Sequence, residues 1–203
     1  MNLALFDFDG TITRGDSWRP FMRLAAGSVR KLVAYTVLAP VGVGYYAGLV
    51  AGRTARPMFA RVAFRGVDTA RVNTLGRQYA SEVLPDTVRP RAQEQIAWHK
   101  HNGDRIVVVS GSLAVYVRPW CERESVDCIA TELEERGGRL TGRYLGGECI
   151  GAEKALRIRQ AYDLRQYAHV YAYGDTAEDR EMLALASHPY YRWRETNGSA
   201  KAG

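Results

Sequence analysis

The sequence is poor in cysteine, with three residues in 203, and no two of them have the CxxC spacing of a metal or redox pair. An odd number without such a pair argues against a disulfide scaffold and a zinc knuckle, and favours a reducing compartment. The opening residues, MNLALFDFDG, become acidic at once, whereas a secretory signal starts with basic residues and continues with a longer apolar run. We therefore expect a cytoplasmic location.

The sequence also lacks a strong compositional bias. Hydrophobic residues make up 46% of the chain and charged residues 25%, which excludes wholesale disorder and the collagen-like and fibrous classes. A chain of 203 residues can bury a sizeable core, as one domain with a substantial insertion or as two small domains.

Acidic residues are scarce in one part of the chain. Between Asp16 and Leu84 there are ten Arg and Lys residues and three acidic residues, so this segment carries +7 while the whole chain carries +6. A basic segment in a near-neutral body indicates an anionic partner, such as phosphate or an acidic lipid, although a solvated arginine-rich surface has the same pattern. Nucleic acid is not expected, because the aromatic residues of this segment stand in apolar runs and do not alternate with its arginines.

Residues 32–52 contain no charged side chain, and Arg53 follows them directly. Their number is close to that of a membrane span, but a proline and two glycines interrupt them between Pro40 and Gly44. Two buried helices that meet at Pro40–Gly44 are the interpretation that length and breakers favour. A hairpin that enters one leaflet, with Arg53 and Arg56 at anionic headgroups, is a second interpretation. A true span is a third, which the broken, glycine-rich sequence disfavours.

Short apolar runs that end in polar residues recur along the chain. They occupy Leu3–Phe8, Arg105–Val109 and Val170–Tyr173, which is the pattern of buried parallel strands whose carboxyl ends carry function. Helical segments precede the second and the third run, and this alternation implies right-handed crossovers and a parallel sheet. We expect these helices at Arg89–His101 and Glu153–Asp163, and a β-hairpin on or beside the sheet from Ile129–Leu133 and Arg139–Tyr144.

Residues 16–84 interrupt this pattern. They are helical in character and follow the first strand and its loop directly, so we interpret them as an inserted helical-bundle cap. The expected fold class is therefore α/β, with a three-layer, Rossmann-like parallel sheet core. The core is expected to comprise residues 1–15 and 85–203, and the cap residues 16–84.

Polar side chains gather at the predicted carboxyl ends of these strands. Asp7 and Asp9 end the first strand with one residue between them, so we expect both carboxylates on the same side. Gly10 allows a sharp turn that exposes N–H groups to an anion. Ser110 and Gly111 follow the second strand and offer a hydroxyl and free N–H groups at a helix start, an arrangement that binds phosphate.

Three more candidate residues come from the last third of the chain. Lys154 opens a predicted helix and can reach the same edge of the sheet as a point charge. Asp175 and Asp179 follow the third strand, four residues apart. Each has an ordinary structural role open to it, such as a surface lysine or an acid that caps a helix. Their coincidence at the edge where open α/β sheets bind ligands favours a functional site.

Together these residues suit phosphoryl transfer. Carboxylate oxygens of Asp7 and Asp175, with a backbone carbonyl, are the hard ligands that Mg²⁺ prefers. Mg²⁺, Lys154 and Ser110 would neutralise a phosphoryl group during its transfer. One aspartate of the first loop can attack phosphorus and form an aspartyl-phosphate, while the other can protonate the leaving alcohol and later activate water.

The sequence resembles the haloacid dehalogenase-like phosphatases in four motifs. These are DFDGT at residues 7–11, the serine at 110, the lysine at 154 and GDxxxD at 174–179, in the order that the family has. The resemblance implies a Mg²⁺-dependent phosphatase in which Asp7 is the nucleophile and Asp9 the general acid/base. It implies that Gly10, Ser110, Gly111 and Lys154 bind the phosphate, and that Asp7, Asp9 and Asp175 hold the metal with support from Asp179.

The cap resembles the four-helix cap of a subfamily that includes the phosphoserine phosphatases. Asp16 falls where those enzymes place a longer glutamate for the substrate amine. The apolar, basic cap and the chain end GDTAEDREMLALASHPYYRWRE are more similar to the C-type phosphatidylglycerophosphatases. This resemblance implies a lipid-linked or anionic phosphate monoester, such as phosphatidylglycerophosphate or a lysophosphatidate, and peripheral contact with the inner face of an anionic membrane.

Two alternative functions stay open. A phosphatase for phosphoserine or another small soluble monoester would need a small polar pocket in which Asp16 meets the amine. A non-catalytic membrane-binding module is the alternative of another class. The clustered carboxylates argue against it, because unused like charges in close proximity lower stability.

Overall fold

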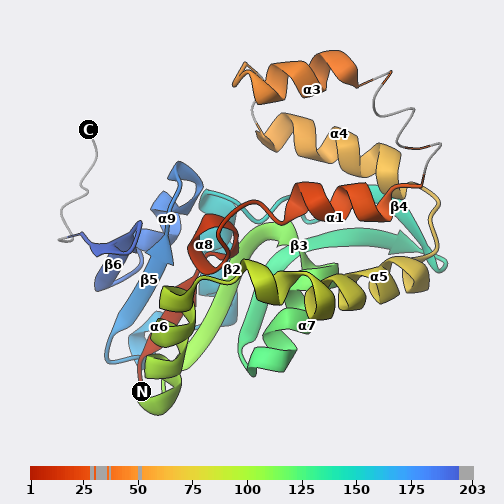
Figure 1. Cartoon of the computed structure of the whole chain (residues 1–203). Helices are drawn as coiled ribbons and strands as arrows, with labels where there is room; N and C mark the ends of the chain where they lie inside the picture. Colours follow the sequence, from red (N-terminus) through yellow and green to blue (C-terminus); the bar gives the residue numbers. More distant parts are fainter. Residues whose placement is uncertain (28–29, 31–35, 37, 50–51, 197–203) are drawn as a thin grey trace.

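A central β-sheet organises the molecule (Figure 1). The computed structural model describes residues 1–27, 30, 36, 38–49 and 52–196. Within these residues the sheet has seven strands in the order β4-β3-β2-β1-β5-β6-β7.

The first strand lies in the middle of this sheet. β1 (Leu3–Phe6) pairs in parallel with β2 (Arg105–Leu113) on one side and with β5 (Val170–Gly174) on the other. Leu3 is in register with both Arg105 and Val170. The later strands therefore lie on both sides of β1, and this makes its carboxyl end a switch point, the place where open α/β sheets bind ligands.

The outer strands make the sheet mixed, whereas a parallel sheet was expected. β3 (Asp127–Arg136) and β6 (His188–Tyr191) are parallel to their inner neighbours, but β4 (Arg139–Leu145) and β7 (Arg194–Glu195) are antiparallel edge strands. β3 and β4 form the predicted hairpin. β6 and β7 were not predicted, because their segment is short and contains a proline.

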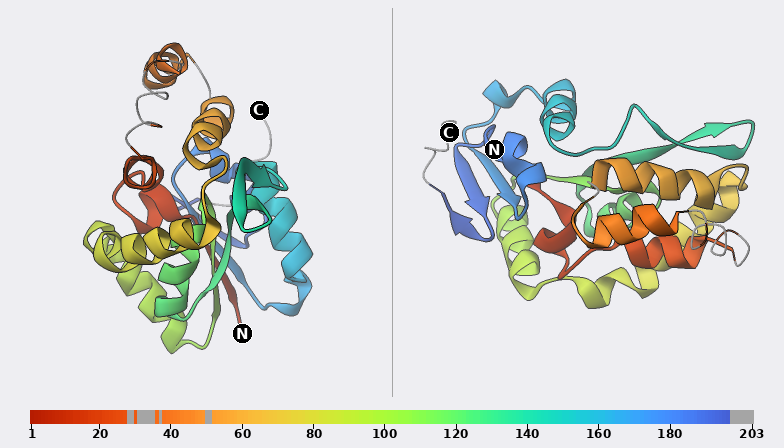
Figure 2. Two further views of the ribbon diagram at one scale, coloured as in Figure 1. Left: turned by 90° about the vertical axis from the view of Figure 1, so that its right-hand side faces the viewer. Right: turned by 90° about the horizontal axis from the view of Figure 1, so that it is seen from above.

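Successive residues of β1 enter different hydrophobic cores, since the side chains of a strand alternate between the two faces of its sheet. Leu3 and Leu5 belong to the core that contains Ile158 and Met182, whereas Ala4 and Phe6 belong to the larger core on the other face. Figure 2 shows α5, α6 and α7 on one side of the sheet and α8 on the other. The three-layer α/β class is therefore confirmed.

The predicted helices of the core are present. The expected segments Arg89–His101 and Glu153–Asp163 correspond to α6 and α8, whose ends differ from the expected ones by at most two residues. The core helices and helical turns are α6 (Pro90–His101), α7 (Ala114–Glu124), α8 (Ala152–Ala161), α9 (Arg180–Leu183), η2 (Leu84–Thr87), η3 (Leu164–Gln166) and η4 (Ala177–Asp179).

The first strand is shorter than its apolar pattern predicted. β1 ends at Phe6, and a helical turn, η1 (Phe8–Ile12), follows. Asp9 is extended within this turn, and Gly10 has a φ of +82°, a conformation that favours glycine. Asp7 and Asp9 are therefore not successive outward residues of one straight strand, and their side chains have different partners.

In the described part of the segment after this turn there are four helices, and we refer to them together as the cap. Figure 1 shows α3 outermost, with α4 between it and α1. α5 is joined closely to the core, because a Cβ on Gly76 would lie 2.0 Å from the carbonyl oxygen of Val115 in α7. The cap helices are α1 (Trp18–Ala25), α3 (Ala39–Tyr46), α4 (Gly52–Phe64) and α5 (Thr69–Glu82).

The uncharged stretch does not break where a break was expected. α3 runs from Ala39 to Tyr46 and therefore continues through the Pro40–Gly44 run. A proline is tolerated in a first helical turn, where its missing N–H has no partner to lose. Most of residues 28–37 lie outside the described part of the chain, as do residues 50–51. The expected helix that precedes Pro40 falls mainly in the first of these gaps. None of the helices described is long and apolar enough to cross a membrane.

A buried histidine connects the end of α6 to the sheet. His99 is fully buried, with Nδ1 2.8 Å from Oδ2 of Asp104 and Nε2 3.0 Å from the hydroxyl of Tyr173. The Tyr173 ring stacks on Phe6 of β1 at 4.3 Å between centroids. Burial lowers the pKa of His99, although its hydrogen bond to Asp104 opposes the change.

We expect His99 to make the stability of the fold depend on pH. A histidine whose pKa is lower in the folded state binds fewer protons there, so stability is complete above the unfolded pKa, about 6.5, and falls as the pH drops below it. Each pH unit in that range removes up to about 1.4 kcal/mol. Urea unfolding at pH 7.5 and 5.5 measures the loss, which should shrink in His99→Gln and persist in His101→Gln, a change at an exposed residue of the same helix. An equal loss in both variants would contradict this expectation.

Candidate active site

A cavity of about 370 Å³ lies at the carboxyl ends of β1, β2 and β5. It occupies the switch point of the sheet, and α1 and α4 of the cap also contribute to its lining. Every residue assigned to the site from the sequence lies in this lining, so the fold brings together residues from distant parts of the chain. These residues are Asp7, Asp9, Gly10, Asp16, Ser110, Gly111, Lys154, Asp175 and Asp179.

Lys154 lies between two carboxylates. It belongs to the first turn of α8, and its Nζ donates to Oδ1 of Asp7 at 2.5 Å and to Oδ1 of Asp179 at 2.6 Å. Its side chain is 2% exposed. Burial alone would lower the pKa of Lys154, but the two aspartates raise it above its usual range. Lys154 is therefore a fixed positive charge at this point of the cavity.

Asp7 has an unusual electrostatic environment. Burial raises the pKa of Asp7 to about 8 even though Lys154 opposes the change, and the charge of Asp179 adds to the increase. The backbone N–H of Asp7 donates to the carbonyl of Tyr173 at 2.9 Å, which attaches the residue to the neighbouring strand. Burial, together with the charge of Asp179, therefore outweighs the effect of Lys154 on the pKa of Asp7.

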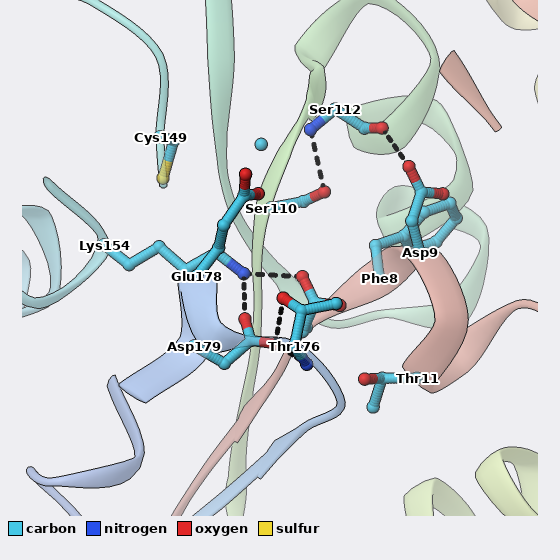
Figure 3. Close-up of polar contacts among 12 residues, drawn as sticks. Phe8, Asp9, Thr11, Ser110, Ser112, Cys149, Lys154, Thr176, Glu178 and Asp179 are labelled. Carbon is cyan, nitrogen blue, oxygen red and sulfur yellow. Dashed lines mark hydrogen bonds and ion pairs between the residues drawn. The ribbon is translucent and has the colours of Figure 1, made fainter. Parts of the chain in front are cut away.

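Asp179 is held by the loop that follows β5. Its Oδ2 accepts from the backbone N–H groups of Asp175 and Thr176, both at 3.0 Å, and from the Thr176 hydroxyl at 3.2 Å (Figure 3). A Cβ on Gly174 would lie 2.5 Å from the Cβ of Asp179. The carboxylate of Asp179 is therefore oriented by its own loop, with the other oxygen turned to Lys154.

The residues present fit a hard divalent cation. Asp7, Asp175 and Asp179 each offer a carboxylate oxygen, and the three atoms lie within 4.8 Å of one another. Oxygen donors are the ligands that Mg²⁺ prefers, and a cation here would offset the repulsion between these carboxylates. Gly10 leaves room for this group, because a Cβ at that position would lie 2.3 Å from Oδ2 of Asp175.

Asp9, assigned to the metal from the resemblance, does not contribute its carboxylate to this group of described residues. Its Oδ1 accepts from the backbone N–H of Ser17 at 3.0 Å. Its Oδ2 accepts from the Ser112 hydroxyl at 2.5 Å, the contact that Figure 3 shows. Burial raises the pKa of Asp9, while the hydrogen bonds from Ser112 and Ser17 oppose the change. This carboxylate lies on the side of the cavity toward the cap, where such a group can donate or accept a proton.

Ser17 and Ser112 were missed by the sequence analysis. Ser17 immediately precedes α1, and its hydroxyl donates to the Tyr116 hydroxyl at 3.2 Å and lies 3.3 Å from that of Ser112. Tyr79 of α5 donates to the Ser17 carbonyl at 3.1 Å. The available signal for Ser112 was its place directly after Ser110 and Gly111. No local pattern distinguishes Ser17 from an ordinary helix-capping serine.

Ser110 and Gly111 lie within β2, which continues to Leu113, whereas the apolar pattern had placed them after the strand at a helix start. The hydroxyl oxygen of Ser110 accepts from the backbone N–H of Ser112 at 3.0 Å, which leaves its own O–H free to donate toward the cavity. Gly111 is enclosed, since a Cβ there would lie 2.6 Å from Cγ2 of Ile150 and 3.6 Å from Nη1 of Arg56. The packing of Ile150 therefore requires glycine at this position of the cavity wall.

Asp16 is already engaged within the cap. Its Oδ1 accepts from the backbone N–H of Trp18 at 3.1 Å, and its Oδ2 pairs with Nε of Arg19 at 3.1 Å. Arg14 and Arg89 also line the cavity. The rim near Asp16 is therefore rich in arginine, which suits an anionic group better than an amine.

The leaflet hypothesis placed Arg56 at anionic headgroups, but its side chain is directed elsewhere. It lines the catalytic cavity, and its Nη1 lies 2.9 Å from Oε1 of Glu148 and 3.6 Å from Oε2 of Glu178. The net charge of residues 16–84 does not determine the direction in which the Arg56 side chain points. The side chain of Arg53, the other residue of that hypothesis, lies outside the described part of the structure.

The chain is similar in sequence to known proteins. A model of the haloacid dehalogenase-like hydrolase family matches residues 4–184. Protein CicA of Caulobacter vibrioides is 32% identical over 194 residues, which cover 94% of this chain and 85% of that protein. A histidinol-phosphatase of Neisseria meningitidis is 28% identical over 120 residues, which cover 56% of this chain and 54% of that enzyme.

A solved structure shares the fold. A phosphoserine phosphatase with bound substrate superposes with a TM-score of 0.65 at 19% sequence identity, over 92% of this chain and 83% of that one. The match covers most of the chain, so the two proteins share their overall fold.

Proposed function

Because the chain belongs to the haloacid dehalogenase-like hydrolase family, we propose that it is a Mg²⁺-dependent phosphomonoesterase that acts through an aspartyl-phosphate on Asp7. One observation supports the proposal above the others. Lys154 lies at hydrogen-bond distance between Asp7 and Asp179, in the cavity that Ser110 also lines. A nucleophile, a fixed positive charge and a hydroxyl donor thus face one space, as phosphoryl transfer requires.

In the first step a carboxylate oxygen of Asp7 attacks phosphorus, and the bond between phosphorus and the alcohol oxygen breaks. Asp9 transfers its proton to that oxygen, so the alcohol leaves as a neutral molecule. Lys154, the Ser110 hydroxyl and the N–H groups near Gly111 would bind the phosphoryl oxygens. Ser17 and Ser112 keep the Asp9 carboxyl group on the side from which the alcohol departs.

In the second step Asp9, now ionised, takes a proton from water. The water oxygen attacks phosphorus, the bond between phosphorus and Asp7 breaks, and phosphate is released. Both aspartates return to their initial protonation states. Burial under the cap favours this sequence, because exclusion of bulk water strengthens each electrostatic contact within the cavity.

Asp7, Asp175 and Asp179 are the residues that would hold Mg²⁺. When bound, the ion would supply positive charge that stabilises the phosphoryl oxygens and offsets the repulsion between the carboxylates. Asp9 can contribute through its backbone carbonyl, since its side chain is committed to Ser17 and Ser112.

The rim of the cavity favours an anionic substrate over an amine. Asp16, the candidate for an amine, is neutralised by Arg19, while Arg14, Arg56 and Arg89 add positive charge. We therefore favour a lipid-linked or otherwise anionic phosphate monoester, such as phosphatidylglycerophosphate or a lysophosphatidate. The exposed Val43 and Leu49, on and just after the outermost helix, support peripheral contact with the inner face of an anionic membrane.

A small soluble phosphate is the second candidate function. The similarity to a histidinol-phosphatase and to the fold of a phosphoserine phosphatase supports it, as does the modest volume of the catalytic cavity, about 370 Å³. In that case Asp16 would exchange Arg19 for the amine of the substrate.

The test is phosphate release from phosphatidylglycerophosphate in mixed micelles and from phosphoserine in buffer, each with and without divalent metal. We expect EDTA to stop the reaction, Mg²⁺ to restore it, and Ca²⁺ to restore it poorly, because Ca²⁺ adopts longer and looser coordination than the octahedral Mg²⁺. Preference for the lipid would support the first candidate, and preference for phosphoserine the second. Release that continues without metal from the metal-stripped protein would contradict the role given to the aspartate cluster.

A further inference from the structure

A second hollow, of about 560 Å³, lies between α4 of the cap and the segment formed by β4 and the loop after it. We refer to it as the groove. Its volume is in the range of small-molecule sites. Two exposed arginines, Arg61 and Arg143, belong to its lining. The apolar part of the lining consists of Pro57, Met58, Tyr144 and Ile150.

The groove and the catalytic cavity share a wall. Arg56 lines the cavity, and the next residue of α4, Pro57, lines the groove. Arg56 donates to Glu148 at 2.9 Å, and Glu148 also lines the groove. At a second point Gly111 of β2, which lines the cavity, packs against Ile150, a residue of the groove. The two hollows are therefore neighbours at two separate places.

Glu148 adds a polar feature to this wall. Its side chain is 6% exposed, and one carboxylate oxygen is held by Arg56. The other oxygen, Oε2, is buried and has no hydrogen-bond partner in the described part of the chain. A buried acceptor without a donor is unfavourable, and a hydroxyl at the polar end of a bound amphiphile would satisfy it. An apolar wall with one or two fixed polar groups is typical of a ligand site.

We propose that the groove binds the hydrocarbon chain of the substrate, so that the substrate is an amphiphilic phosphate monoester. Its phosphate would lie beside Lys154, and its chain would cross the Arg56–Glu148 pair and lie against Met58 and Tyr144. This inference rests on the proposed phosphatase function and names the class of alcohol that the enzyme releases. The positive charge of Arg61 and Arg143 fits an amphiphile that carries further negative charge near its chain.

A series of n-alkyl phosphates from propyl to octyl, at concentrations below micelle formation, tests the proposal with the full-length protein. Each methylene that becomes fully buried should raise kcat/KM by about fourfold. Partial burial reduces this factor, so we expect an increase of roughly 30-fold from propyl to hexyl phosphate. Alkylphosphonates of the same lengths, which cannot release phosphate, should show a parallel decrease in their inhibition constants.

Met58→Glu locates the effect. Met58 is 39% exposed on α4, so the fold should accept the change, and a thermal melt checks this. We expect the ratio of kcat/KM for hexyl to that for propyl phosphate to fall at least about tenfold, because a carboxylate opposes burial of the chain. Leu156→Glu is the matched control, an equal change at a 49% exposed leucine of α8 outside the groove, and it should keep the wild-type ratio. Met58→Gln provides an uncharged second variant.

The outcomes separate this proposal from the one on which it rests. Hydrolysis of every alkyl phosphate at similar efficiency would overturn the groove proposal and leave the phosphatase function standing. An increase with chain length that Met58→Glu and Met58→Gln do not reduce would also overturn it, since the chain would then bind elsewhere. Failure to release phosphate from any monoester in the presence of Mg²⁺ would contradict the phosphatase function itself.

Discussion

Asp7→Asn should reduce phosphate release by at least about 1,000-fold. The amide is almost the same size as the carboxylate but is a very poor nucleophile, so the covalent step fails. The fold should persist, because Lys154 keeps its contact with Asp179 at 2.6 Å. Steady-state phosphate release and a thermal melt of the same preparation measure the two effects.

A covalent readout makes the test of Asp7 specific. Wild-type enzyme quenched in acid during turnover should carry one phosphoryl group on the peptide that contains Asp7, and Asp7→Asn should carry none. Asp163→Asn, at an aspartate that pairs with Arg165 in η3, is the control and should retain activity and labelling. Full activity of Asp7→Asn would remove Asp7 from the role of nucleophile.

Lys154→Met should damage both activity and stability. Asp7 and Asp179 would then face each other in a buried site without their shared cation, and breaking a buried ion pair in this way costs about 3–5 kcal/mol. The pKa of Asp7, already raised by burial to about 8, would rise further, so less of the nucleophile would be ionised at neutral pH. We expect phosphate release to fall at least about 100-fold.

Urea unfolding of the metal-free protein measures the loss of stability in Lys154→Met. Lys100→Met is the matched control, because Lys100 pairs with Glu124 at 3.3 Å with both side chains about 40% exposed, and exposed pairs contribute at most about 1 kcal/mol. Mg²⁺ should recover more stability in Lys154→Met than in the wild type, since it binds where charge is least compensated. Equal stability of the two lysine variants would show that Lys154 does not balance the aspartates.

The positions of the main site residues could be predicted because they depend on local pattern and on a general property of parallel sheets. Asp7, Ser110 and Asp175 each follow an apolar run, and the carboxyl ends of such strands meet at one edge. The same reasoning placed the hairpin of β3 and β4. It failed at β6, the strand next to the edge of the sheet, where a proline in a four-residue strand leaves no alternating pattern.

The partners of the site residues could not be predicted in this way. The Ser112 hydroxyl meets Asp9 across 103 positions of sequence, and no period or spacing encodes such a contact. The net charge of residues 16–84 indicates an anionic partner, but it does not determine the direction of one side chain. Arg56 is an example: its charge had suggested contact with a lipid surface, but its side chain points to Glu148 and the cavity.

The hydrogen bond from the Ser17 N–H to Asp9 makes proton transfer by Asp9 depend on the position of α1 in the cap. Ser17 immediately precedes α1, and the Tyr79 hydroxyl of α5 donates a hydrogen bond to its carbonyl. A compound that holds α1 away from this position would therefore meet an Asp9 carboxyl group out of alignment, and it would dissociate unreacted. Discrimination would accordingly be expressed in the turnover number more than in the apparent affinity, as in induced fit. Abundant small phosphates could then occupy the cavity and depart without being hydrolysed.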